Sequence, residues 1–315
     1  MANVDTSLPA RPTGAAAKLA DAHAAEHPLK LYGGWFCPFV QRSWIVLEEK
    51  NIPYEYREIN PYKKEAEFLA LNPRGLVPTL AVPRNDANSK QQKPLYESSV
   101  ICEYLNDEYG DESKHGPNLF PPGSAYERAR CRLWIDHISG KIVPGFYKFI
   151  QHTPEKGYTI DEARANFLSH IKTLVREMLE NSEDTGPWFL GERFSMVDVM
   201  LAPWAKRMFL LDHYKPGGVA IPAEGQGGED KALWGRWRTW YNAIVDRQSV
   251  RDTWSDDDYY IQAYKRYAED TTNSEVAQAT RKGRHCHDKM KLLYVGIKQR
   301  VYFQCQSNGA NYLQA

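Results

Sequence analysis

The residue best placed to do chemistry is Cys37, which is followed directly by Pro38. A short alternating apolar run and Gly33 precede this pair, and an apolar pattern at helical spacing follows it. Because proline suits the first position of a helix, this order predicts a strand, a turn and a helix with Cys37 at the N-cap. The helix N-terminus would stabilise a thiolate, and Arg42 adds a positive charge one turn later. A lone cysteine is more often a buried core residue, but this location favours a nucleophile.

A second candidate feature is Pro78, which lies inside the apolar run of residues 76–82. Proline is disfavoured in a central strand, so it indicates either an edge strand or a strand start with a special peptide bond. A cis bond between Val77 and Pro78 would leave the backbone N–H and C=O of Val77 free to pair with an extended ligand. The run alone does not decide between this arrangement and a plain edge proline.

A third feature is the acid Glu97, which stands directly before Ser98 and Ser99 and an apolar run at helical spacing. Ser98 or Ser99 is expected to cap a helix. The amides and hydroxyl at such a helix start can bind a carboxylate, and Glu97 can pair with an ammonium group. Ordinary capping explains the serines equally well, and a solvated surface acid is the simpler interpretation of Glu97.

These features lie in a region that alternates between strand and helix patterns. A strand is expected over residues 54–59 and a short helix over residues 63–71. Residues 84–94 form a polar insert with turn residues, typical of a mobile hairpin loop, and a short strand resumes at residues 95–96. Residues 111–123, rich in proline, glycine and charge, form the clearest linker.

The chain beyond this linker follows helical periodicity. Ser195 and Asp198 form a capping-box pattern ahead of one apolar run. Helices are expected over residues 125–150, with a kink at Pro144, and over residues 161–181, 199–211, 232–245 and 256–268. The predicted fold class is therefore an α/β domain followed by an all-helical domain.

The domain boundaries follow from these patterns. We expect the first domain over residues 29–110 and the second over residues 124–270, with an N-terminal extension over residues 1–28. Residues 271–315 change character and are expected to form a disordered or loosely attached tail. The triplet His285, Cys286 and His287 lies in this tail, but three adjacent residues chelate one ion poorly, so no metal is expected.

Composition excludes several classes of function. Lys plus Arg equals Asp plus Glu at 40 each, so no global field favours nucleic acid or an anionic membrane. The five cysteines have neither disulfide nor metal spacing, which fits a reducing compartment. No apolar run is long enough to span a membrane, and the acidic N-terminal residues argue against a mitochondrial presequence. We expect a cytoplasmic protein.

The combination of these motifs resembles a known family. A small α/β domain with Cys-Pro at its first strand-to-helix turn and Val-Pro before its third strand has the pattern of the thioredoxin-like fold. Followed by Glu97-Ser98 and a helical domain, it resembles the glutathione transferases over roughly residues 29–270. The tripeptide Cys37-Pro38-Phe39 is similar to the omega class, and fungal omega-like members are most alike. Dimerisation is implied by this resemblance alone.

The resemblance also implies a role for each matching residue. Cys37 would form a mixed disulfide with glutathione, where most transferases use a Tyr or Ser hydroxyl to polarise the thiol. The other implied positions are Phe39 and Val77 at the cysteinyl segment with Pro78 in cis, Lys64 at the glycyl carboxylate, Glu97 and Ser98 at the γ-glutamyl group, and Arg207 and Tyr260 in the acceptor pocket.

The function expected from these residues is thiol transfer. Because position 40 is Val40, a thioredoxin-like internal disulfide is not available, and a second glutathione must resolve the mixed disulfide. The expected activities are thioltransferase and dehydroascorbate reductase, with glutathione as co-substrate, no permanent cofactor, and a small electrophilic or disulfide acceptor. One alternative is a glutathione-dependent reductase or transferase on quinones or other aromatic metabolites, in detoxification or fungal secondary metabolism.

A non-enzymatic alternative also stays open. The intracellular chloride-channel proteins share the omega-like motif, and some scaffold proteins use the transferase fold for assembly. The retention of Lys64, Glu97 and Ser98 beside Cys37 favours an occupied glutathione site, because a scaffold needs none of them.

Overall fold

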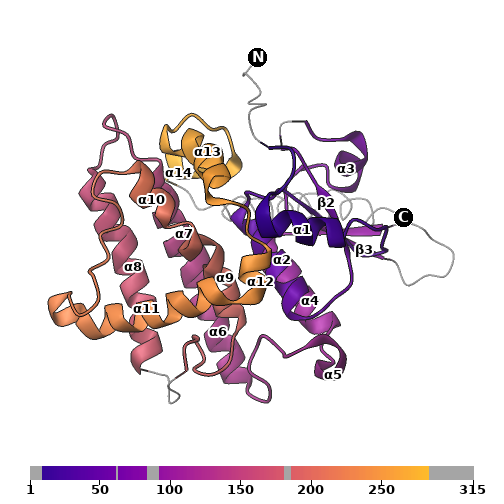
Figure 1. The fold of residues 1–315 in the computed structure, drawn as a ribbon, viewed down its shortest axis with the longest axis horizontal. Coiled ribbons are helices and arrows are strands. Elements are labelled where there is room, and N and C mark those ends of the chain that lie inside the picture. Colours follow the sequence, from indigo (N-terminus) through magenta and orange to yellow (C-terminus); the bar gives the residue numbers. More distant parts are fainter. Residues whose placement is uncertain (1–8, 62, 84–91, 181–185, 284–315) are drawn as a thin grey trace, which may run out of the picture.

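The computed structural model describes residues 9–61, 63–83, 92–180 and 186–283 of the 315-residue chain. Figure 1 shows a sheet-containing N-terminal part in indigo beside a helical part that runs from magenta to yellow. This arrangement confirms the expected fold class, in which an α/β domain is followed by an all-helical one.

The N-terminal part is built on one mixed sheet with the strand order β2-β1-β3-β4. Strand β1 (Lys30–Gly33) pairs in parallel with β2 (Glu55–Glu58), and Lys30 lies opposite Glu55. Strand β3 (Thr79–Pro83) pairs antiparallel with both β1 and β4 (Gln92–Tyr96). The edge strand β4 begins earlier than the expected residues 95–96, and it includes Pro94 because an edge position tolerates a missing N–H. Residues 84–91 of the predicted loop lie outside the described residues.

Helices cover both faces of this sheet. Alternation along β1 sends Leu31 into the main core, which also contains α2 (Pro38–Glu49) and α4 (Ser98–Glu108). The next residue, Tyr32, faces the opposite side, where it packs with Phe68 of α3 (Ala66–Leu71). Helix α3 begins at Ala66 and not at the expected residue 63, because the chain is still extended at its N-cap Glu65.

The predicted linker contains one helical turn. Helix α5 (Glu112–His115) begins where the Asp111 side chain accepts the N–H of Ser113 at 3.1 Å. Residues 111–123 are therefore not wholly irregular, since an aspartate N-cap is enough to start a short helix.

The helical part begins with a long, nearly continuous rod. Helix α6 (Ala125–His137) passes through a π-helix (η1, Ile138–Ile142) into α7 (Val143–Ile150). Pro144 lies in the first turn of α7, so the irregularity precedes the proline instead of forming a kink at it. Because proline lacks an N–H and crowds the preceding turn, a widened π turn accommodates it.

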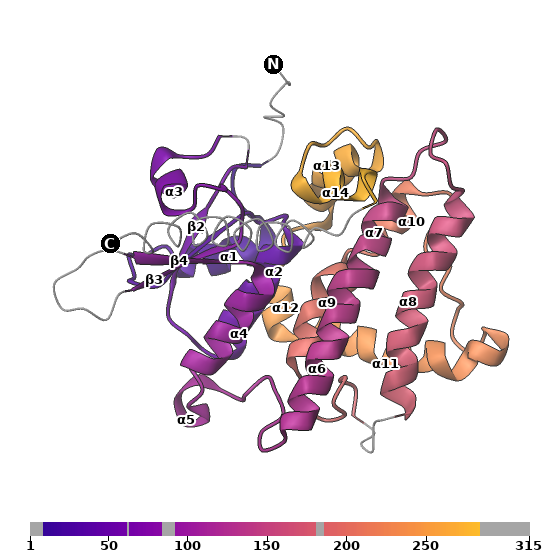
Figure 2. The same ribbon diagram turned by 180° about the vertical axis from the view of Figure 1, so that it is seen from behind.

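The remaining helices pack around this rod (Figures 1 and 2). The apolar face predicted for residues 161–181 is buried, and the capping box of Ser195 and Asp198 is present. The run expected as one helix over residues 199–211 is interrupted at Arg207. The elements are α8 (Ile160–Glu180), α9 (Met196–Lys206), α10 (Phe209–Tyr214), the 3₁₀ turn η2 (Gly228–Asp230), α11 (Lys231–Asp246), α12 (Gln248–Asp252), α13 (Asp257–Ala268) and α14 (Glu275–Arg281).

The chain before residue 29 contributes to the fold. Helix α1 (Gly14–Ala22) lies beside α12, and its Ala16 and Ala20 side chains are buried (Figure 1). The N–H of Ala16 donates to the carbonyl of Trp254 at 3.1 Å. The N-terminal extension is therefore attached to the helical domain through α1, and after α1 the carbonyl of His23 accepts the N–H of Tyr56 in β2 at 2.8 Å.

The expectation of a loosely attached tail is wrong for residues 271–283. This stretch contains α14, which packs against α7, and Ala277 is buried there. Residues 284–315, with the His285, Cys286 and His287 triplet, lie outside the described residues. Among the helices that the structure describes, none has the length and apolar character needed to cross a membrane.

Candidate active site

Cys37 occupies the position that its sequence neighbours predict. It is the N-cap of α2, and Pro38 is the first helical residue. The N–H of Cys37 donates to the carbonyl of Gly34 at 2.9 Å, which closes the turn that connects β1 to α2. The half-buried cysteine lines a cavity of about 460 Å³.

Side chains from the helical domain hold the carbonyl groups of this turn. The hydroxyl of Tyr260 donates to the carbonyl of Trp35 at 3.4 Å. The hydroxyl of Tyr264 and the Nη2 of Arg207 both donate to the carbonyl of Phe36, each at 3.4 Å. The position of Cys37 therefore depends on contacts between the two domains as well as on α2.

Arg207 and Tyr260, which the resemblance placed in the acceptor pocket, do not line the cavity. Both side chains are fully buried behind the turn. The guanidinium of Arg207 also donates to Oε1 of Gln41 at 2.5 Å and to the carbonyl of Pro203 at 2.8 Å, and it lies 4.7 Å from the ring centroid of Tyr260. The structure gives these two residues contacts that support the turn.

A second buried arginine joins the elements beneath the site. Arg42 donates from Nε to the carbonyl of Met200 at 3.0 Å, and its other nitrogens lie 3.4 Å from the hydroxyls of Ser98 and Ser139. Its guanidinium lies over the ring of Trp204, 4.4 Å from the centroid. Burial lowers the pKa of Arg42 to about 10, so the side chain remains charged at neutral pH.

The thiol of Cys37 ionises less readily than the sequence suggests. Burial raises the pKa of Cys37 above the ordinary cysteine value. The amides of Val40 and Phe39 and the charges of Arg207 and Arg42 act in the opposite direction, but they do not outweigh burial. The expected stabilising groups are present, and the expected low pKa is not found.

The structure brings seven of the sequence-predicted residues to one cavity. They come from the start of α2, the loop before α3, the loop before β3 and the start of α4. These residues are Cys37, Phe39, Lys64, Val77, Pro78, Glu97 and Ser98. Among the described residues, no group of three His, Cys, Asp or Glu side chains could hold a metal ion.

The Val77–Pro78 bond is cis, as one of the two interpretations of the sequence required. Asn72 fixes the preceding loop, because its Nδ2 donates to the carbonyl of Leu76 at 3.2 Å and to Oγ1 of Thr79 at 2.9 Å. No described residue forms a hydrogen bond with the backbone N–H or C=O of Val77. Both groups can therefore pair with an extended ligand in the cavity.

Helix α4 begins one residue earlier than predicted. Glu97, and not Ser98 or Ser99, is its N-cap, and Glu97 has a positive φ of 69°. Its carboxylate accepts a hydrogen bond from Nη1 of Arg74 at 3.0 Å, and Nη2 of Arg74 lies 3.8 Å from Oε2 of Glu275. Sequence reasoning missed Arg74, which lies in the loop between α3 and β3.

The chain beyond residue 270 supplies a wall of the cavity that the sequence did not reveal. Asn273, Ser274, Glu275 and Val276 line it, together with aromatic residues of α7 and α13. The aromatic residues are Tyr147, Tyr264 and Tyr267. The helical spacing of residues 125–150 and 256–268 was the sequence signal for these aromatic residues, and it does not distinguish a cavity wall from a core.

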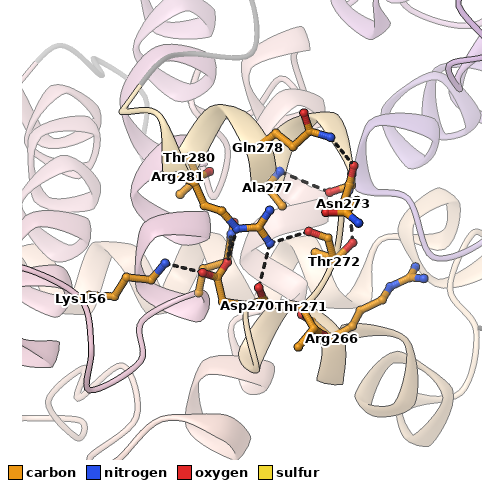
Figure 3. Close-up of polar contacts among 12 residues, drawn as sticks. Lys156, Arg266, Asp270, Thr271, Thr272, Asn273, Ala277, Gln278, Thr280 and Arg281 are labelled. Carbon is orange, nitrogen blue, oxygen red and sulfur yellow. Dashed lines mark hydrogen bonds and ion pairs between the residues drawn. The ribbon is translucent and has the colours of Figure 1, made fainter. Parts of the chain in front are cut away.

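Asp270 fixes this wall through a cluster of hydrogen bonds and ion pairs (Figure 3). Its Oδ1 accepts from Gln151 at 2.8 Å and from Nε of Arg281 at 2.9 Å, and Oδ2 pairs with Lys156. Nη2 of Arg281 also donates to the carbonyls of Asp270, at 2.8 Å, and Thr272, at 2.5 Å. Burial opposes ionisation, but the bonds from Lys156 and Gln151 and the charge of Arg281 hold the pKa of Asp270 below its ordinary value.

Comparison with known proteins identifies the family. Residues 36–108 match the family model for the glutathione S-transferase N-terminal domain, and residues 157–243 match that for the C-terminal domain. Glutathione S-transferase omega-1 from Sus scrofa is 32% identical over 186 residues, which are 58% of this chain and 68% of that protein. The chain belongs to the glutathione transferases.

A solved structure similar to this transferase also points to the omega class. The crystal structure of glutathione transferase Omega 3C from Trametes versicolor is similar at a TM-score of 0.67 and 40% identity, and it covers 84% of this chain and 100% of that one. Pyrimidodiazepine synthase from Drosophila melanogaster is 30% identical over 58% of this chain and 66% of that protein. This omega-like transferase thus has a thioredoxin-like domain followed by the helical domain of the family.

Proposed function

We propose that this glutathione transferase acts by thiol transfer, with Cys37 as the nucleophile that forms a mixed disulfide with glutathione. The activities proposed are thioltransferase and dehydroascorbate reductase. The observation that carries the proposal is that Cys37 shares one cavity with the backbone of Val77 and with the polar side chains Lys64, Glu97 and Ser98. These groups suit the parts of a γ-glutamyl tripeptide.

Each part of glutathione has a proposed partner. The free N–H and C=O of Val77 would pair with the cysteinyl backbone, which Phe39 would flank. The ammonium of Lys64 would meet the glycyl carboxylate. Ser98 at the start of α4 would bind the γ-glutamyl carboxylate, and Glu97 the ammonium. Because Arg74 already pairs with Glu97, the incoming ammonium would share that carboxylate with a guanidinium.

The proposed reaction has two balanced exchanges. The Cys37 thiolate attacks the glutathionyl sulfur of a mixed disulfide, so a Cys37–glutathione bond forms and the acceptor leaves as a thiolate that takes up a proton. A second glutathione thiolate then attacks the glutathionyl sulfur on Cys37, which releases glutathione disulfide and restores the Cys37 thiolate. The net exchange turns the mixed disulfide and one glutathione into the free acceptor thiol and glutathione disulfide. Reduction of dehydroascorbate instead consumes two glutathione molecules, which supply its two electrons and leave as glutathione disulfide.

The need for a second glutathione follows from the other cysteines. Cys102 and Cys131 are buried and do not line the cavity, and burial raises the pKa of each to about 12. The side chain three residues after Cys37 is Val40. Among the described residues, Cys37 is therefore the one thiol at the cavity.

The cavity walls favour one variant of this function, in which the acceptor is aromatic. Tyr147, Tyr264 and Tyr267 place ring surfaces on the side of the cavity that belongs to the helical domain, and Phe36 of the active-site turn also lines the cavity. Flat acceptors such as quinones pack well on such surfaces. A glutathione-dependent reduction or transfer on aromatic metabolites would use the same cysteine.

We further propose a homodimer in the glutathione-rich cytoplasm. The dimer is supported by apolar area exposed on two neighbouring helices, at Val100 on α4 and at Tyr126 and Leu133 on α6. These two helices are linked by the hydrogen bond from Arg132 to Glu103. Size-exclusion chromatography coupled to light scattering tests it, and a mass of one chain would contradict it.

Substitution of Cys37 tests the mechanism. Cys37→Ala is expected to abolish the hydroxyethyl-disulfide activity and to remain folded, because the side chain is small and half-buried. Cys37→Ser is the matched variant, which replaces the thiol with a hydroxyl that cannot form a disulfide. Full thiol transfer by either purified variant would refute the role of Cys37. Retention of the wild-type protein on glutathione-agarose without turnover would instead favour a non-enzymatic scaffold.

A further inference from the structure

We infer that Glu58 is a positioning residue for Cys37. The carboxylate of Glu58 holds a backbone amide of the active-site turn and gives the reactivity of the cysteine a second dependence on pH. Glu58 touches neither the thiol nor the glutathione cavity. It acts through Trp35, two residues before the cysteine. The inference rests on the proposed function only in taking Cys37 as the nucleophile.

The geometry places both oxygens of Glu58 in hydrogen bonds. Oε1 accepts the backbone N–H of Trp35 at 3.0 Å, and Oε2 accepts the hydroxyl of Tyr56 at 2.8 Å. Glu58 is the last residue of β2, and the next N–H, that of Ile59, donates to the carbonyl of Gly33 at 2.6 Å. The end of β2 is therefore joined directly to the turn that leads to Cys37.

Trp35 transmits this contact because it is fixed on every other side. Among the described residues, Glu58 is the one hydrogen-bond partner of its backbone N–H. Its buried indole donates from Nε1 to the carbonyl of Pro9 at 3.0 Å and packs edge-on against Tyr260. A change in the bond to Glu58 therefore acts on the turn and not on a freely moving side chain.

Glu58 can change its charge in the range where thiols react. It borders a second cavity of about 310 Å³, whose charged and titratable lining groups are Arg11, Arg57, Glu65, Glu67, Tyr32 and Tyr56. Burial raises the pKa of Glu58 to about 8. The amide of Trp35, the hydroxyl of Tyr56 and the charge of Arg11 lower this pKa, but burial has the larger effect. Glu58 is thus mostly protonated below this pH and ionised above it, where its bond to Trp35 is strongest.

The charges that act on the thiol itself belong to other residues. Arg207 and Arg42 lower the pKa of Cys37, and Glu58 has no resolved effect on it. A direct repulsion between Glu58 and the thiolate would make the cysteine less reactive at high pH. A tighter hold on the turn predicts the opposite, so the sign of the effect separates the two mechanisms.

The test is the pH profile of Cys37 alkylation by iodoacetamide from pH 6 to 10, with the site assigned by peptide mass spectrometry. Glu58→Gln retains an acceptor for Trp35 but stays neutral at every pH. We expect Cys37 in this variant to be alkylated at the wild-type rate at pH 6.5 and about fivefold more slowly at pH 9.5. The difference arises because a charged acceptor forms a stronger hydrogen bond than a neutral one. The wild-type profile should show a separate inflection near pH 8.

Glu48→Gln is the matched control. Glu48 is also a half-buried acid that accepts a tyrosine hydroxyl, that of Tyr54 at 2.8 Å, but it does not touch the turn. Its profile should follow the wild type throughout. An equal effect in the control would assign the change to stability and overturn the inference.

Tyr56→Phe provides an independent variant should Glu58→Gln fail to fold. It removes the hydroxyl donor and keeps the ring that stacks on Trp44. Because that hydroxyl lowers the pKa of Glu58, its loss should move the inflection to higher pH. The role of Glu58 would be overturned if the inflection of Tyr56→Phe did not move. It would also be overturned if the profile of Glu58→Gln superimposed on that of the wild type, or if Glu58→Gln were alkylated faster than the wild type at pH 9.5. Alkylation needs no glutathione, so these results are independent of whether Cys37→Ala retains activity.

Discussion

The cluster around Asp270 gives a quantitative prediction about the wall of the active-site cavity. Asp270→Asn removes the charge that pairs with Lys156 and Arg281 but keeps the size of the side chain. The side chains in both pairs are between 15% and 28% exposed, so solvent screens the pairs only in part. Each charge-assisted bond contributes about 1 kcal/mol at such a site, which makes the expected loss about 2 kcal/mol.

This loss should appear first in residues 271–283, because Arg281 also holds the carbonyls of Asp270 and Thr272 (Figure 3). A loss of about 2 kcal/mol increases the open population about 30-fold. Hydrogen exchange measured by mass spectrometry is therefore expected to be about 30-fold faster in the peptide that contains α14, with little change in α8.

A neighbouring exposed pair serves as the control. Glu269 lies 3.8 Å from Lys265, and both side chains are more than half exposed, so Glu269→Gln should leave the exchange of α14 unchanged. Opening of α14 should also let bulky thiol reagents reach Cys37 faster, while small ones react as before. Unchanged exchange of α14 in Asp270→Asn would refute the claim that Asp270 holds the wall.

Two other predictions concern the glutathione side of the cavity and the folding of the helical domain. Arg74→Ala removes the guanidinium that pairs with Glu97. The KM for glutathione in steady-state assays should then fall about threefold at unchanged kcat, because the incoming ammonium no longer competes with one partly exposed ion pair. An increase in KM would show that Arg74 binds glutathione itself. Asp198→Ala removes the acceptor of four hydrogen-bond donors. These are the N–H of Phe189, the indole of Trp240, and the N–H and hydroxyl of Ser195. The free energy of unfolding measured with denaturant should therefore fall by about 3 to 5 kcal/mol. A loss below about 1 kcal/mol would mean that the capping box contributes little.

Local sequence chemistry predicted the position of Cys37 and left the bond before Pro78 open between two interpretations. The position of Cys37 at an N-cap follows from Pro38 and the helical spacing after it, and the structure selects the cis bond before Pro78. Both features depend on backbone preferences of adjacent residues. The shift of the α4 N-cap to Glu97 was not predictable in this way, because a glutamate with positive φ departs from those preferences.

Contacts between distant segments could not be predicted from the sequence. Three features of the site each involve segments that are far apart in the chain. They are the burial of Arg207 behind the turn, the pairing of Arg74 with Glu97, and the cavity wall formed by residues 273–276. The raised pKa of Cys37 has the same origin, because burial is a property of the whole fold, whereas the opposing helix N-terminus is visible locally.

The most direct test of the central claim is the mass of the protein after incubation with glutathione disulfide. The account predicts one added glutathionyl group, located on the peptide that contains Cys37, removed by excess glutathione and absent from Cys37→Ala. An adduct on another cysteine, or none on Cys37 under conditions in which the enzyme turns over, would contradict thiol transfer through Cys37.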